Sequence, residues 1–110
     1  MSLKDTNVVN AERRKRVAIV IANPVVSATT GWNVGFWWSE LTHPYYEFTE
    51  KGYEVEVFSP DGGRCEPDAM SDPRDVSGYS ATDLISMGFI HTPAMVAMVE
   101  NTGKAADIDV

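Results

Sequence analysis

The clearest pattern along the chain is an unbroken apolar run over residues 17–22, rich in β-branched side chains. A continuous run of this length is typical of a strand buried on both faces, as in a parallel sheet covered by helices. A second β-rich run covers residues 53–58 and ends in the turn sequence of residues 59–63. We therefore expect two strands of one parallel sheet.

The segment between these runs predicts a loop followed by a helix. Residues 23–33 carry a proline, a glycine and several Ser and Thr residues, which is typical of a loop. A helix is expected from about residue 35 to Lys51, ended by Gly52 in the position of a left-handed cap. Strand, helix and strand then form a right-handed βαβ unit.

The expected helix has one apolar face that should pack on the sheet. Its stripe follows helical spacing, and Trp38 lies at its border. Trp37 or Trp38, near the helix start, could instead form the wall of a pocket. The stripe consists of Trp37, Leu41, Tyr45 and Phe48.

The second half of the chain predicts a long loop and two short helices. Residues 64–78 form the loop, which is typical of a lid or surface cover. Residues 80–83 resemble a capping box for a helix that stops near Gly88. Thr92 would cap the last helix, whose apolar sequence predicts burial on most sides. Residues 106–110 look like the approach to a third strand.

Composition and charge narrow the functional class. The 110 residues, 44% of them apolar, suit one globular domain. A net charge of -7 argues against non-specific nucleic-acid binding. We expect no membrane partner, because no apolar run approaches the roughly 18 residues of a span. A single cysteine fits a cytoplasmic location.

Glu40 is the candidate for chemistry. It shares a helix flank with Glu47 but lies nearer the carboxyl edge of the sheet by about 10 Å, at about 1.5 Å per residue. Only Glu40 can therefore reach the crevice where open α/β sheets bind ligands. Pro44 removes a backbone bond to the carbonyl of residue 40, and such departures from good helix design are frequent at functional sites. Alternatively, Pro44 simply divides the segment into two helices.

The cysteine and the histidines carry weaker signals. Arg64 supplies the positive charge that a reactive thiolate needs, but Glu66 offsets it, so Cys65 is interpreted as a non-catalytic loop thiol. His43 and His91 show no pairing pattern, and no residue spacing matches a zinc or calcium site. His43 is expected on the exposed face of its helix.

Several motifs occur together in an order and spacing that resemble the ThiJ/PfpI family. The resemblance is closest to its branch of heat-shock chaperones and glutathione-independent glyoxalases, within the class I glutamine amidotransferase-like superfamily. The motifs are Thr30-Gly31, Gly35-Phe36-Trp37, Glu40, His43-Pro44-Tyr45-Tyr46, Gly52-Tyr53-Glu54-Val55, Ser59-Pro60-x-Gly62-Gly63 and Asn101-Thr102-x-Lys104-x-Ala106-Asp107.

The resemblance implies a flavodoxin-like three-layer α/β/α sandwich with a parallel sheet. Residues 16–110 would form the N-terminal half of that domain, and residues 1–15 a flexible arm. The family's acid is a glutamate followed four residues later by a proline, here Glu40 and Pro44. Gly35 and Trp37, at the start of the same helix, would border the binding site.

The family's nucleophile is a cysteine on a tight strand-to-helix elbow, and Cys65 does not occupy that position. An all-apolar first strand needs strand neighbours and helices over both faces, which two strands and about three helices do not supply, so we expect a complementary C-terminal half in the same gene product or a second chain. The resemblance implies that this half carries the cysteine. On this interpretation the 110-residue chain alone is inactive.

The expected function of the complete protein is a cofactor-free, metal-free glyoxalase III-type reaction on small reactive carbonyls such as methylglyoxal, in a homodimer. The thiolate would attack the aldehyde, and Glu40 would move protons as a hydroxy acid forms. An alternative is a stress-related holdase without catalysis. Hydrolysis of peptide or amide bonds ranks lower, because nothing in the sequence forms an oxyanion hole.

Overall fold

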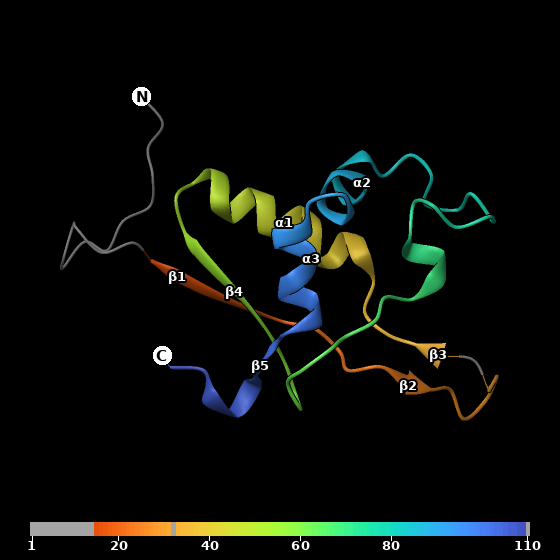
Figure 1. Ribbon diagram of the computed structural model, residues 1–110, viewed down its shortest axis with the longest axis horizontal. Helices are drawn as coiled ribbons and strands as arrows, with labels where there is room; N and C mark the ends of the chain where they lie inside the picture. Colours follow the sequence, from red (N-terminus) through yellow and green to blue (C-terminus); the bar gives the residue numbers. More distant parts are fainter. Residues whose placement is uncertain (1–14, 32, 110) are drawn as a thin grey trace.

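A three-stranded parallel sheet is the centre of the fold (Figure 1). The computed structural model describes residues 15–31 and 33–109, so the expected arm lies outside them except for Lys15. Strands β1 (Arg16–Val20), β4 (Glu54–Ser59) and β5 (Gly103–Lys104) follow the order β1-β4-β5. The predicted α/β class with a parallel sheet is confirmed.

Three helices gather on one side of the strands in Figure 1 and enclose one core. They are α1 (Trp38–Glu50), α2 (Leu84–Ile90) and α3 (Pro93–Glu100), with short 3₁₀ turns η1 (Ala69–Ser71) and η2 (Ala105–Asp107). The ring of Phe89 is fully buried at the centre. The core consists of Ile21, Phe36, Trp38, Leu41, Val57, Cys65, Phe89 and Val99.

The sheet has one covered and one exposed face. Ile19 in β1 and Val57 in β4 point toward the helices. The side chains next to them along each strand point to the other face of the sheet. Val20 keeps 51% of its surface exposed. The prediction that the first strand is buried on both faces is therefore wrong for the described residues. The helices form a layer over one face only, and β1 lies at the edge of the sheet.

The entry to α1 differs from the expected one. The helix begins at Trp38 and not at residue 35, because Trp37 is still in an extended conformation (φ -98°, ψ 125°). As a result Trp38 is buried beside Leu41, whereas Trp37 is only half-buried. The other end is as predicted, since Gly52 follows the helix with φ 88°.

A close approach of two backbone segments holds this entry in place. Phe36 bridges to Pro67, and the Asp68 N–H donates to the Phe36 carbonyl at 2.7 Å. A Cβ atom on Gly35 would lie 1.8 Å from the carbonyl oxygen of Glu66. Only glycine permits this contact, which fixes where α1 starts.

Three other segments depart from the sequence-based expectation. The expected loop of residues 23–33 contains an antiparallel hairpin of β2 (Val25–Val26) and β3 (Asn33–Val34). The third sheet strand, β5, precedes the predicted residues 106–110, of which Val110 lies outside the described residues. In α3 only Val99 is buried, so the prediction of burial on most sides is wrong. Helix α3 meets neighbours on one flank, mainly α2 and β4.

Four side chains join α1 to α2, and we call them the α1–α2 clasp: Thr42, His43, Asp83 and Ser86. The fully buried hydroxyls of Thr42 and Ser86 lie 2.8 Å apart. His43 Nε2 lies 2.9 Å from Asp83 Oδ1. Asp83, and not the expected Ser80, caps α2 by accepting from the Ser86 N–H at 3.1 Å, and α2 continues past Gly88 to Ile90.

The clasp also sets the ionisation of Asp83. Burial of this carboxyl favours its neutral form, but hydrogen bonds from the Ser86 hydroxyl and backbone N–H, together with His43, outweigh that effect. The pKa of Asp83 consequently lies below its ordinary value. The carboxylate is thus part of the folded structure and stabilises it.

Replacing Gly35 with alanine should test the close approach to Glu66. Because the clash is with backbone, the two segments must separate, and we expect the free energy of unfolding to fall by about 3 kcal/mol. Gly88 is the matched control: a Cβ atom there meets nothing within 4 Å, and Gly88→Ala should stabilise α2 by about 0.5–1 kcal/mol. Denaturant unfolding of both variants measures the difference, and equal effects would contradict this explanation.

Asp83→Ala should lower the free energy of unfolding by about 1–2 kcal/mol at pH 7, through loss of the helix cap. The folded-state pKa of Asp83 is depressed below its unfolded value of about 3.9, so its contribution is present above that pH and disappears as the pH falls through the folded-state pKa. Asp83→Asn keeps a cap acceptor and should lose only about 0.5 kcal/mol, from the His43 pair. Chemical denaturation between pH 2 and 7 checks this ranking, which equal losses in both variants would refute.

Candidate functional site

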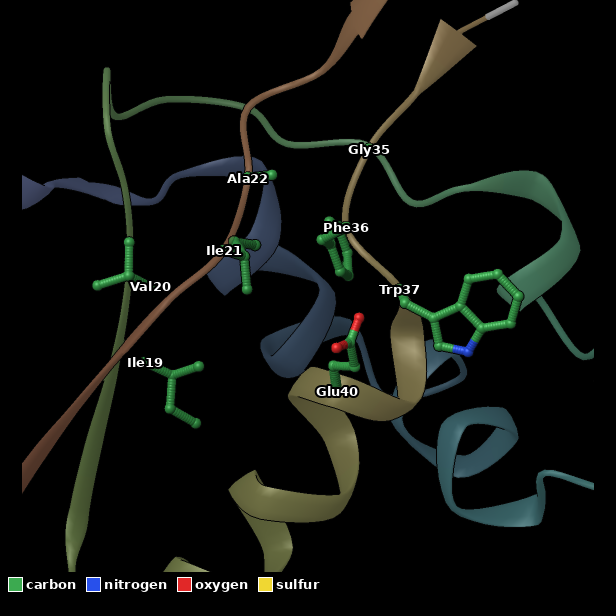
Figure 2. A pocket seen from close by; sticks show the side chains of 8 residues that line it. All are labelled: Ile19, Val20, Ile21, Ala22, Gly35, Phe36, Trp37 and Glu40. Carbon is green, nitrogen blue, oxygen red and sulfur yellow. The ribbon is translucent and has the colours of Figure 1, made fainter.

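Glu40 lies in the first turn of α1 and lines a pocket of about 310 Å³ (Figure 2). It is the only ionisable side chain among the lining residues, and the rest of the lining is apolar. The carboxylate points from the helix toward the space between β1 and the segment that leads into α1, as Figure 2 shows. The lining consists of Ile19, Val20, Ile21, Ala22, Gly35, Phe36, Trp37 and Glu40.

The expected depth of Glu40 along the helix agrees with this location. Among the described residues Glu47 forms an exposed ion pair with Lys51 at 3.7 Å, one helical turn away, whereas no ion pair involves Glu40. Glu40 itself is exposed, because the pocket is partly open to solvent. A carboxylate in the first turn also stabilises a helix through its dipole, which is the simplest structural role for this residue.

Pro44 lies inside α1, and the helix continues through it without division into two pieces. Because proline has no N–H, the carbonyl of Glu40 receives no bond from residue 44. One backbone hydrogen bond of the helix is therefore missing next to the carboxylate. The sequence predicted this departure from regular helix bonding beside Glu40.

Gly35 and Trp37 form the opposite wall of the pocket. Gly35 contributes backbone, because its close approach to Glu66 excludes any side chain. The indole of Trp37 turns away from the Glu40 carboxylate in Figure 2 and meets Tyr79 edge-on, with ring centroids 6.0 Å apart. The segment between β4 and α2 thus touches the pocket wall through Tyr79, one residue beyond the predicted loop of residues 64–78.

A second groove of about 470 Å³ lies on the other side of Trp37 and includes the His43–Asp83 pair of the clasp. His43 is exposed, as its helix position predicted. Sequence reasoning missed Asp83 as its partner, although the capping box around Ser80 contained the signal. The four clasp residues form hydrogen bonds with one another, so the evident role of the clasp is to join α1 to α2.

Cys65 lies in the core and is only 3% exposed. Its sulfur contacts the side chains of Asn23 at 3.7 Å and Thr102 at 3.8 Å. Arg64, the nearest cation in sequence, pairs with Glu66 at 3.7 Å. A buried thiol with polar but uncharged neighbours is the setting of an inert cysteine.

The described part of the chain contains neither a metal-binding cluster nor a membrane-spanning helix. No three His, Cys, Asp or Glu side chains of residues 15–31 and 33–109 gather closely enough to hold a metal ion. No helix in the same ranges has the length and apolar character needed to cross a membrane.

Comparison with known proteins adds information on the fold. No protein-family model and no curated protein matches the chain. It is similar to the X-ray structure of the Rapid Encystment Protein 24 kDa (REP24) of Francisella tularensis, with a TM-score of 0.69 and 24% sequence identity. The match covers 86% of this chain and 39% of that chain. The chain therefore spans less than half of the solved protein that it matches, and it shares the α/β fold over that part.

Proposed function

We propose that this chain supplies the proton-handling half of an enzyme site of the ThiJ/PfpI type, which acts on small reactive carbonyls such as methylglyoxal. One observation carries the proposal: Glu40 is a single ionisable group in an otherwise apolar pocket beside the carboxyl end of β1. Open α/β sheets bind ligands at that end of their strands. The motif resemblance assigns the same residue to the family's acid.

The chemistry needs a nucleophile that a complementary half would supply. A thiolate attacks the aldehyde carbon and forms a hemithioacetal, whose oxygen takes up a proton. Glu40 then moves the proton from that carbon to its neighbour, and water releases the hydroxy acid and the thiol. Gly35 and Trp37 would border the bound carbonyl. The complementary half would have to cover the open side of the pocket to keep water from the reacting atoms.

Cys65 is a poor candidate for that nucleophile. It is buried in the core and contacts Asn23 and Thr102, neither of which can carry charge. A nucleophilic thiolate needs a nearby cation or helix N-terminus and access to substrate. The proposal therefore depends on the complementary half for the sulfur atom.

Glu40→Gln in the complete protein should reduce methylglyoxal consumption by about 10²–10⁴-fold, the usual contribution of a general acid–base group. Glu47→Gln is the matched control, because Glu47 lies on the same helix, is exposed and is paired with Lys51. It should leave the rate unchanged. The loss of methylglyoxal and the formation of lactate give the rates, and an unchanged rate for Glu40→Gln would rule out the proposed role.

A holdase function remains the second candidate, favoured by the exposed apolar side chains of the described residues. Val25, Val26 and Leu84 keep 58%, 64% and 74% of their surfaces exposed. A holdase should suppress aggregation of a denatured client equally well after Glu40→Gln and after thiol alkylation. Light scattering measures this, and a loss of suppression after either change would count against simple binding.

A further inference from the structure

The groove on the other side of Trp37 from the Glu40 pocket is built from two segments of the chain. Its volume of about 470 Å³ lies within the range of about 300–1,000 Å³ that ligand pockets occupy. One wall consists of Trp37 and the first turns of α1, and the other consists of the residues that lead into α2. The Trp37 indole turns toward this groove and away from the Glu40 carboxylate (Figure 2). Apart from Trp37, the chemistry proposed for Glu40 uses no part of this groove.

The groove carries no uncompensated charge. The only lining side chains that can be charged at neutral pH are His43 and Asp83, which pair at 2.9 Å. The Asp83 carboxylate also accepts from the hydroxyl and the N–H of Ser86, at 2.5 and 3.1 Å. An anionic ligand would find no free cation in this lining, and a cationic ligand would compete for a carboxylate that already has three partners. An uncharged ligand therefore fits the groove best.

Several polar groups of the lining have no partner among the described residues. The hydroxyls of Ser39, Tyr79 and Thr82 form no hydrogen bond within residues 15–31 and 33–109. The Nδ1 atom of His43 is equally free there, and it can accept a hydrogen bond while Nε2 donates to Asp83. Hydroxyls both donate and accept, so this set matches the hydroxyls of a polyol. It is a poorer match for an extended peptide, which binds at a strand edge, because no strand lines the groove.

Aromatic and aliphatic surface lies beside these polar groups. The Tyr79 ring meets Trp37 with centroids 6.0 Å apart, and the residue still keeps 67% of its surface exposed. Leu84 is 74% exposed and adds aliphatic surface to the lining. The segment that carries Tyr79 is fixed in part by the Ser80 hydroxyl, which donates to the Met70 carbonyl at 2.7 Å. The ring is thus in place before a ligand binds, which lowers the entropic cost of binding.

We propose that this groove binds a neutral carbohydrate. A sugar ring has an apolar C–H face and hydroxyls along its edge, and the groove offers a complement to each. The C–H face packs on Tyr79, and the hydroxyls bond to Ser39, Thr82 and Nδ1 of His43. The proposal is independent of the chemistry at Glu40, because the two sites share only Trp37.

Titration of the complete protein with disaccharides, followed by NMR, tests this site without any substitution. The probes are maltose, cellobiose and N,N′-diacetylchitobiose at millimolar concentrations. At least one of them should shift the amides of Tyr79 and Thr82 and the indole N–H of Trp37 until the shifts saturate. Glycerol at the same concentration of hydroxyl groups is the control for a general solvent effect, and it should leave these signals unchanged.

Tyr79→Ala should weaken the binding of that disaccharide by about tenfold, because the sugar face loses its aromatic contact. Thr82→Val replaces one hydroxyl with a methyl group of similar shape and should weaken binding by about threefold to tenfold. Val76→Ala is the matched control from the same segment, since Val76 is fully exposed and lies outside the groove lining. Its affinity should be unchanged, and the amide spectrum of each free variant shows whether the fold is intact.

Five results would overturn the proposal. Two concern the signals: no saturable shift with any of the three disaccharides, or shifts confined to residues 19–22, which would place the sugar in the Glu40 pocket. Two concern other ligands: equal shifts with glycerol, or tighter binding of an uncharged tripeptide amide of glycine and serine. The fifth is undiminished affinity in a folded Tyr79→Ala protein. Glu40→Gln should bind the disaccharide normally, so failure of the proposed chemistry and failure of this site are separate results.

Discussion

The parallel pairing of β1 with β4 is the constraint on which the rest of this structure depends. Its register sets Ile19 beside Val57 and Val20 beside Phe58. Because side chains alternate across a strand, the first pair enters the helix-covered core and the second lies on the opposite face. The same pairing uses one edge of β1 and leaves the other edge next to the Glu40 pocket. Core, exposed face and open pocket thus follow from one set of backbone bonds.

The second constraint is the entry to α1. The bridge between Phe36 and Pro67 keeps the chain extended up to Trp37. A helix starting at residue 35 would place Glu40 in its second turn, whereas the observed start places it in the first. The carboxylate therefore lies close to the carboxyl end of β1 because Gly35 allows two backbones to touch.

Hydrophobic period and glycine position were sufficient to predict β1, β4, the central helix and its end at Gly52. The place of Glu40 followed from its depth along that helix. Features that depend on contacts between distant segments could not be predicted. The exchange of Trp37 for Trp38 in the core depends on the bridge to Pro67, which no local pattern indicates. The choice of Asp83 over Ser80 as helix cap depends on His43 and Ser86, and His43 lies in another helix.

Two predictions of burial proved wrong, for β1 and for α3, and both overestimated how much of the segment is buried. Both segments have the composition of fully buried elements, and both keep apolar side chains exposed in the described residues. An apolar composition favours burial, so the exposure of both segments is compatible with the proposed complementary half. In β1 the exposed side chains lie on the face of the sheet that the helices leave uncovered. A segment that covered the Glu40 pocket would exclude water from it, and electrostatic interactions of the carboxylate would strengthen in the drier site.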